Sequence, residues 1–163
     1  MKLITYNTDY KLQLQQLVID YFNEVHEGEV TGDLSDAGDM IDCAINEGKA
    51  IYLVIDKEQV VAYLIVYIQT QYNMTPAIVM CDYMYVTPSH RSTSAIVYLY
   101  GMVGKVCNDY QLDAIGSTFA NSSNMKNNKI IEGKVIATTY RFKLEEQQAF
   151  SSRFIKRMEA SNK

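Results

Sequence analysis

A short strand-to-helix turn carries residues that could bind an anion. The stretch Tyr83–Cys107 begins as an apolar strand, bends at Pro88 and continues as an apolar helix, with Arg91 and several small hydroxyl side chains in the bend. A helix N-terminus exposes unpaired backbone N–H groups with partial positive charge, and an arginine beside it can pair with a phosphate oxygen. The same pattern also fits a capped helix start with Ser92 or Thr93 as the N-cap. The turn by itself leaves both interpretations open.

One carboxylate lies inside an otherwise apolar strand. Asp82 interrupts the run IVMCDYMYV. Burial raises the pKa of a carboxyl group toward values useful for proton transfer, and buried carboxylates without a role are uncommon. Strict alternation along the strand places Asp82 on the same face as Met84 and Val86. Tyr83 and Tyr85 then lie on the opposite face. Asp82 is therefore either a candidate for proton transfer or a residue on the solvent-facing side of a sheet.

The composition is that of a single globular domain. The chain has 163 residues, of which 48% are hydrophobic and 21% charged, and a formal net charge of −4. Nucleic-acid partners favour a basic surface, so the acidic balance argues against them unless Arg153, Lys156 and Arg157 form a basic patch in the tail. The start of the chain has no signal-peptide hydrophobic region, and no apolar run reaches the roughly 20 residues of a membrane span. We therefore expect a cytoplasmic protein without membrane insertion.

The cysteines show no metal-binding or disulfide pattern. Cys43, Cys81 and Cys107 are far apart, and no Cys-x-x-Cys pair is present. Each of the three lies in an apolar pattern, which is typical of reduced thiols in a hydrophobic core. We expect three buried free thiols and no metal site.

The elements that position these residues follow from hydrophobic periodicity. We expect strands over 2–7, 50–55, 60–68, 77–86, 112–119 and 134–144. Helices are expected after Thr8, which can cap the first, and after Ser35, which can cap the second before Gly48 ends it. A third helix is expected over 93–110 and a short one within 121–133.

The order of these elements predicts the fold class. Two strands joined by the polar turn DKEQ form a hairpin, and a later strand–helix–strand crossover sets two parallel strands side by side. The sequence therefore predicts an α+β (α/β) domain.

This order and the opening turn together resemble the GCN5-related N-acetyltransferase (GNAT) superfamily. The stretch VTPSHR matches the Val-x-Pro-x-x-Arg of that family residue for residue, at Val86, Pro88 and Arg91. At the start of the helix the family motif has glycine at the position of Ser94, and glycine or alanine at the position of Ile96.

The resemblance continues toward the C-terminus. Gly133 matches the end of the family's last helix, and Tyr140, Arg141 and Leu144 match the Tyr-Arg-x-x-Leu of its closing strand. Asn121 matches approximately the asparagine that opens the last helix beside the cofactor. The resemblance covers residues 2–144.

The resemblance implies a fold and a co-substrate. The fold is a mixed, mostly antiparallel central sheet with helices on both faces and one parallel strand pair splayed at a cofactor cleft. It implies one domain over 1–144, which leaves 145–163 as an amphipathic helical tail. The implied co-substrate is acetyl-coenzyme A. The residues implied to bind it, partly through their backbone, are Tyr85, Val86, Thr87, Arg91, Ser92, Thr93, Ser94, Ala95, Ile96 and Asn121.

The resemblance also implies roles in proton transfer. Asp82 lies where many members have the general base on the fourth strand. Many members place a tyrosine in the last helix to protonate the departing thiolate, and here that position is Lys129. Ser122 is a candidate substitute as general acid, as are Ser123 and Tyr98, and the sequence does not choose between them.

Three hypotheses follow for function. The first is an acetyl-coenzyme A-dependent N-acetyltransferase acting on a small amine or a protein amino group. The acidic loop over 26–39 could attract such a cationic amine, or it could be only a solvated loop. The second is a catalytically inactive relative used as a binding or inhibitory module, in the style of acetyltransferase-like proteins of bacteriophages. The third is another acyl transfer on the same fold. A homodimer is a reasonable expectation because exposed tyrosines and an amphipathic tail favour association.

Overall fold

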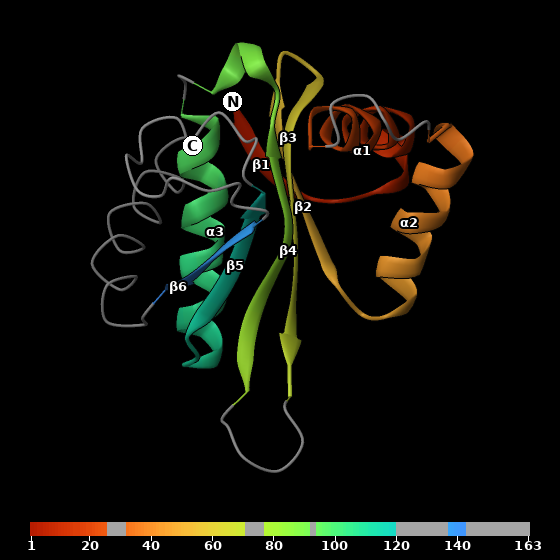
Figure 1. Cartoon of the computed structure of the whole chain (residues 1–163). Coiled ribbons are helices and arrows are strands. Elements are labelled where there is room, and N and C mark those ends of the chain that lie inside the picture. Colours follow the sequence, from red (N-terminus) through yellow and green to blue (C-terminus); the bar gives the residue numbers. More distant parts are fainter. Residues whose placement is uncertain (26–31, 71–76, 92–93, 120–136, 143–163) are drawn as a thin grey trace, which may run out of the picture.

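Within the residues that we describe, six strands form one sheet in the order of the sequence (Figure 1). The computed structural model describes residues 1–25, 32–70, 77–91, 94–119 and 137–142. The strands are β1 (Lys2–Thr5), β2 (Ala50–Asp56), β3 (Gln59–Gln69), β4 (Ile78–Val86), β5 (Ala114–Phe119) and β6 (Ala137–Phe142). All neighbouring pairs are antiparallel except β4 and β5, which are parallel. This confirms the predicted α+β class with its mixed, mostly antiparallel sheet.

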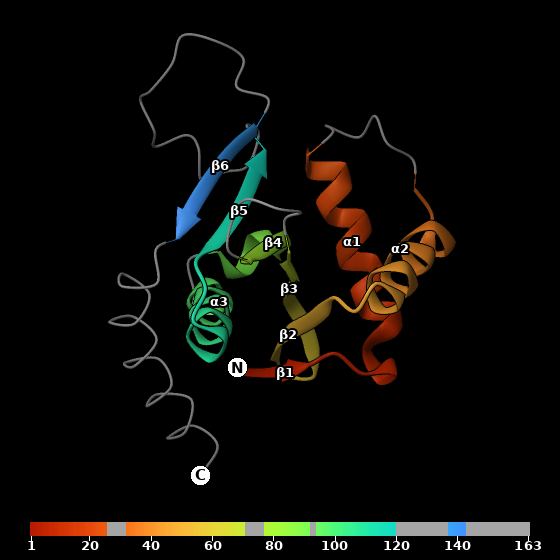
Figure 2. The same cartoon turned by 90° about the horizontal axis from the view of Figure 1, so that it is seen from below.

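Helices cover both faces of the sheet, as predicted (Figures 1 and 2). On one face lie α1 (Lys11–Val25), which follows the short 3-10 helix η1 (Thr8–Tyr10), and α2 (Leu34–Asn46). On the other face lies α3 (Ala95–Tyr110), which follows the 3-10 helix η2 (Pro88–His90). Each face has its own hydrophobic core. Because both faces are covered, the middle of β3 is buried without alternation.

The β2–β3 hairpin is confirmed, and its turn is tight. Lys57 and Glu58 connect the strands with φ angles of 47° and 69°. Two consecutive residues with positive φ match the right-handed twist of a hairpin, although glycine and asparagine are more usual there. The sequence predicted the hairpin from its flanking strands, because the turn residues themselves give no such signal.

The first two helices begin at other residues than predicted. The Asn7 side chain accepts a hydrogen bond from the Asp9 N–H at 3.0 Å, so it caps η1, in place of the predicted Thr8. Asp33, in place of Ser35, caps α2, where it accepts from the backbone N–H of Ser35 and of Asp36. The Asp36 carboxylate in turn accepts from the Asp33 N–H, which completes a capping box. At α2 the Asp33 carboxylate also balances the positive end of the helix, which the Ser35 hydroxyl could not do.

Helices α1 and α2 pack closely at one point. The buried Gln15 side chain donates to the Leu34 carbonyl at 2.8 Å, which ties α1 to the start of α2. A Cβ atom on Gly38 would lie 2.5 Å from the Gln15 side-chain nitrogen, so a larger residue there would force the Gln15 side chain to move. This contact fixes the pair of helices that borders the site described below.

Some predicted core residues are exposed. Cys43 is exposed on α2, which contradicts its prediction as a core thiol, whereas Cys81 and Cys107 are buried. Burial raises the pKa of the Cys107 thiol to about 11, which keeps it protonated near neutral pH. Ile45 and Tyr110 are 44% and 59% exposed, and each lies in the last turn of its helix.

Several predictions lie outside the described residues. These are the short helix over 121–133 with Asn121, Ser122, Ser123 and Lys129, and the amphipathic tail over 145–163. Ser92 and Thr93 in the turn lie outside as well. None of the described helices is long and apolar enough to cross a bilayer.

Candidate active site

Strands β4 and β5 pair only over a short distance. The parallel ladder joins Val79 to Ala114, Met80 to Ile115 and Cys81 to Gly116. Strand β4 continues beyond this ladder to Val86, and β5 continues to Phe119 while it pairs with β6 alone. The ends of two neighbouring parallel strands are therefore not paired with each other. This agrees with the splayed pair that the resemblance implied.

The register of β4 shows which backbone groups face this opening. The Thr87 N–H donates to the Val61 carbonyl at 2.9 Å, so its amide points toward β3. Backbone direction alternates along a strand, so the Tyr85 amide also points toward β3, and those of Met84 and Val86 point toward β5. The resemblance implied co-substrate contacts at Tyr85, Val86 and Thr87. Of these three residues, Val86 has its N–H toward the opening, and Met84 does so as well.

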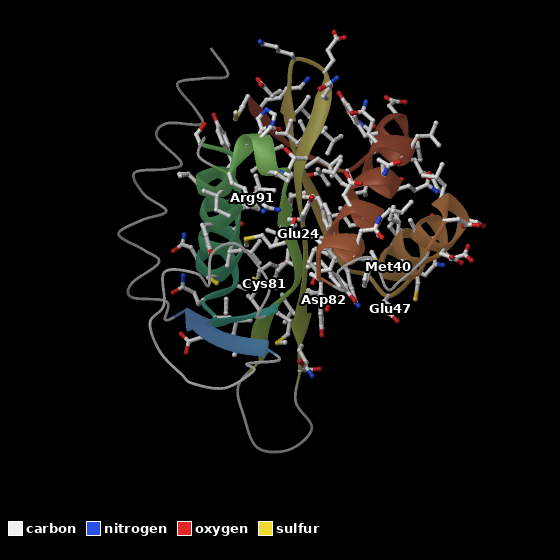
Figure 3. The ribbon with its side chains drawn as sticks, turned by 45° about the horizontal axis from the view of Figure 1, so that its top comes forward. Glu24, Met40, Glu47, Cys81, Asp82 and Arg91 are labelled. Carbon is white, nitrogen blue, oxygen red and sulfur yellow. The ribbon has the colours of Figure 1, made fainter. Side chains whose placement is uncertain are left out.

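Asp82 lies in a β-bulge of β4, directly after the point where β4 and β5 stop pairing. Ile65 of β3 pairs with Tyr83, and Val66 pairs with Cys81, so Asp82 is an extra residue in β4. The bulge turns the side chain of Asp82 toward α1 and α2, while that of Cys81 faces α3 (Figure 3). The alternation predicted from the sequence, with Asp82 opposite Tyr83, is therefore wrong, because one inserted residue reverses the order of the faces.

Asp82 has a close cationic partner. The Lys49 Nζ atom lies 2.8 Å from Asp82 Oδ2 and 2.9 Å from Glu47 Oε2. It also lies 4.9 Å from the centre of the Tyr67 ring. The hydrogen bond to Asp82 is the main cause that raises the pKa of Lys49, so this side chain is a firmly protonated ammonium. Lys49 was not singled out from the sequence, since nothing near it in the chain marks a site.

Aromatic side chains fill the space between β4 and α1 beside Asp82. The Tyr21 ring meets the rings of Tyr83 and Tyr85 edge to face, with centroids 5.6 Å and 6.0 Å apart. Burial raises the pKa of Tyr85 to about 12. The Tyr63 hydroxyl in the same core is fully buried and makes no hydrogen bond. Asp82 is thus bordered by an apolar aromatic wall.

Arg91 faces away from the start of α3. Its Nε donates to the Val86 carbonyl at 3.0 Å, its Nη2 pairs with the Glu24 carboxylate of α1, and its guanidinium lies 5.7 Å from the Tyr85 ring centre (Figure 3). The sequence had assigned this guanidinium to a pyrophosphate oxygen. In the structure it joins the β4–α3 turn to α1, and Glu24 is a partner that the sequence did not indicate.

The start of α3 is more open to an anion than the sequence indicated. Ile96 is half-buried and packs against the core between α3 and the sheet, so its branched side chain lies on the sheet side of the helix. Ser94, at the N-cap position, makes no side-chain capping bond, and its hydroxyl lies 3.6 Å from the Met1 sulfur. Ile96 stands where the family motif has glycine or alanine, but its side chain does not lie between the start of α3 and an anion bound there.

The His90 side chain is tied to its surroundings. Its Nδ1 lies 3.0 Å from the Thr87 hydroxyl and 2.9 Å from the Ser89 hydroxyl, and its Nε2 lies 3.6 Å from an Asp56 carboxylate oxygen. These contacts hold η2 against the β2–β3 hairpin. His90 therefore serves to shape the turn.

A second hollow lies between α1 and α2. Its volume is about 310 Å³, and apolar side chains make most of its wall. Its lining residues are Val18, Ile19, Phe22, Asn23, Gly32, Asp33, Asp36, Ala37 and Met40. The two carboxylates of the predicted acidic loop that reach this hollow are the capping-box pair of α2, so they are already bonded to backbone N–H groups. No group of histidine, cysteine and acidic residues in the described part of the chain is arranged to hold a metal ion.

No family model and no curated protein matches this chain. Solved structures do match. A GNAT-family acetyltransferase from Staphylococcus aureus Mu50 aligns over 88% of this chain and 98% of its own, with a TM-score of 0.65 and 15% identity. A ribosomal-protein-alanine N-acetyltransferase from Brucella melitensis aligns over 86% and 98%, with a TM-score of 0.62 and 10% identity. An aminoglycoside antibiotic 6'-N-acetyltransferase from Acinetobacter haemolyticus aligns over 83% and 95%, with a TM-score of 0.61 and 14% identity. This chain therefore has the fold of the GCN5-related N-acetyltransferases.

Proposed function

We propose that the chain is an acetyl-coenzyme A-dependent N-acetyltransferase whose acceptor is a small amine or a protein amino group. The observation that carries this proposal is the opening between β4 and β5 beyond Cys81 and Gly116, with Asp82 at the fork. An opened pair of parallel strands offers backbone groups to a ligand along one edge, and a carboxylate at the fork can accept a proton there.

The described residues fit acetyl-coenzyme A as a substrate. The Met84 and Val86 N–H groups face the opening and are available to an amide or a thioester carbonyl. The start of α3 could receive the pyrophosphate because a helix N-terminus favours an anion and the Ile96 side chain packs toward the sheet. Ser92, Thr93 and Asn121 complete the proposed binding set from the sequence.

The proposed reaction is a direct transfer. The acceptor nitrogen attacks the thioester carbonyl carbon, a C–N bond forms and the C–S bond breaks. Asp82 receives the proton that the amine loses, and the departing thiolate takes a proton from solvent or from a general acid such as Ser122. A backbone N–H group of β4 aimed at the carbonyl oxygen would stabilise the negative charge that develops there.

A transfer assay tests this proposal. The protein is incubated with acetyl-coenzyme A and a panel of primary amines, and free coenzyme A is measured by chromatography, because the exposed Cys43 would react with a thiol reagent. We expect amine-dependent release of coenzyme A together with acetylated amine. Release that does not depend on any amine, or no release at all, would contradict the proposal.

A second candidate is a binding module that retains the fold without catalysis. It is favoured by the two ion pairs, since Asp82 is bonded to Lys49 and Arg91 to Glu24. Under this alternative, acetyl-coenzyme A binds or fails to bind without any transfer, and replacing Asp82 has no effect on a reaction.

A further inference from the structure

An ammonium group already lies beside the proposed base. Lys49 Nζ is held by Asp82 at 2.8 Å, by Glu47 at 2.9 Å and by the Tyr67 ring at 4.9 Å. Two carboxylates and an aromatic face are the groups that bind alkylammonium ions in proteins. The Lys49 side chain is only 19% exposed, so its ammonium lies within this site rather than over the surface. The geometry is that of an ammonium-binding site with an internal occupant.

The charges at this site leave room for a second cation. Asp82 and Glu47 carry two negative charges, and Lys49 carries one positive charge. The Lys49 ammonium contacts both carboxylates, so it can release Asp82 and keep its bond to Glu47, whose side chain is 53% exposed. An incoming ammonium at Asp82 would then balance the remaining charge.

We propose that Lys49 is a specificity-determining residue that competes with the acceptor for Asp82, and that the acceptor enters as a primary alkylammonium ion. This inference rests on the proposed function, because it takes Asp82 as the base that meets the acceptor amine. An amine binds productively only when it displaces the Lys49 ammonium toward Glu47. It transfers one proton to Asp82, which passes that proton to solvent before the nitrogen attacks the thioester. Asp82 then accepts the second proton as the C–N bond forms and the C–S bond breaks, and the departing thiolate takes a proton from solvent. Weakly basic or neutral amines do not compete with Lys49 and are poor acceptors.

The test removes the Lys49 ammonium by mutation and supplies a free alkylammonium ion in its place. The variant Lys49→Ala loses three methylene groups and the ammonium, and the probe n-propylammonium has the same atoms. Binding is followed by the NMR amide signals of Asp82 and Tyr83, without any co-substrate. We expect saturable binding to Lys49→Ala about tenfold or more tighter than to the unmodified protein. n-Propanol, which has the same shape but no charge, is expected to cause no saturable change.

Two variants serve as controls. Lys49→Met removes the charge but fills the same volume, so it removes the competitor without opening a cavity and is expected to bind propylammonium more tightly than the unmodified protein. Lys105→Ala removes an ammonium from the exposed pair with Asp109 on α3, and it is expected to behave like the unmodified protein. Binding by Lys49→Ala or by Lys49→Met that only equals that of the unmodified protein would overturn the proposal.

A second arm separates this inference from the proposed function. Acetyl-coenzyme A is added to Lys49→Ala and propylammonium, and N-propylacetamide is measured by mass spectrometry. Product that forms at least about tenfold faster than with the unmodified protein supports both proposals. Specific propylammonium binding without product supports the ammonium site and contradicts acetyl transfer. Product without specific binding supports transfer and contradicts the role of Lys49.

Discussion

Replacing Asp82 with asparagine is expected to lower kcat for acetyl transfer by about 10²–10⁴-fold, the usual contribution of a general base. Asparagine keeps the size of the side chain and can still accept a hydrogen bond from Lys49, but it cannot take up a proton. The affinity for acetyl-coenzyme A is expected to stay unchanged, because the side chain of Asp82 faces α1 and α2, whereas the proposed cofactor contacts come from the β4 backbone and the start of α3. Steady-state kinetics and calorimetry measure the two effects separately.

Asp109→Asn is the matched control for this substitution. Asp109 is also paired with a lysine, Lys105, but the pair is exposed on α3. Its turnover is expected to equal that of the unmodified protein. If Asp82→Asn turned over as fast as Asp109→Asn, the assignment of Asp82 as base would be wrong.

Replacing Arg91 with alanine is expected to lower the free energy of unfolding by about 2 kcal/mol, since charged hydrogen bonds contribute more than neutral ones but solvent weakens partly exposed pairs. The substitution removes the bond to the Val86 carbonyl, the ion pair with Glu24 and the contact with the Tyr85 ring. Urea denaturation measures this loss. Acetyl-coenzyme A affinity is expected to fall by less than about tenfold, since the guanidinium faces α1 instead of the start of α3.

Lys11→Ala is the comparison for stability. Lys11 forms an ion pair with Asp42 in which both side chains are more than a third exposed. Its loss is expected to leave the free energy of unfolding nearly unchanged, because solvent weakens exposed ion pairs. An Arg91→Ala variant with unchanged stability and an affinity reduced more than about 100-fold would restore the pyrophosphate role that the sequence assigned to Arg91.

The sequence predicted the fold well because the strongest signals in it are long and periodic. The β2–β3 hairpin, β4 and α3 each follow from an apolar pattern that spans many residues, and their order predicts one parallel pair. The helix starts were less predictable. Asp33 and Ser35 both suit an N-cap, and the capping box with Asp36 decides between them only once the backbone is in place.

The site was predicted in part. The sequence identified Asp82 and the turn before α3, but it could not place the bulge that turns Asp82 toward α1, since a bulge leaves no mark in a run of apolar residues. Lys49 and Glu24 lie 33 and 67 residues from their partners Asp82 and Arg91. Contacts at such separations depend on the register of the whole sheet. The register of β4 on β3 likewise decides that the N–H groups of Met84 and Val86 face the opening, because N–H directions alternate along a strand.

The most direct measurement of the central claim is an NMR titration of the ¹⁵N-labelled protein with acetyl-coenzyme A. The account predicts saturable changes at the amides of Met84 and Val86 and at the start of α3, and smaller changes at Tyr85 and Thr87, whose N–H groups are bonded to β3. The absence of any saturable change, or changes confined to the hollow between α1 and α2, would contradict a cofactor site between β4 and β5.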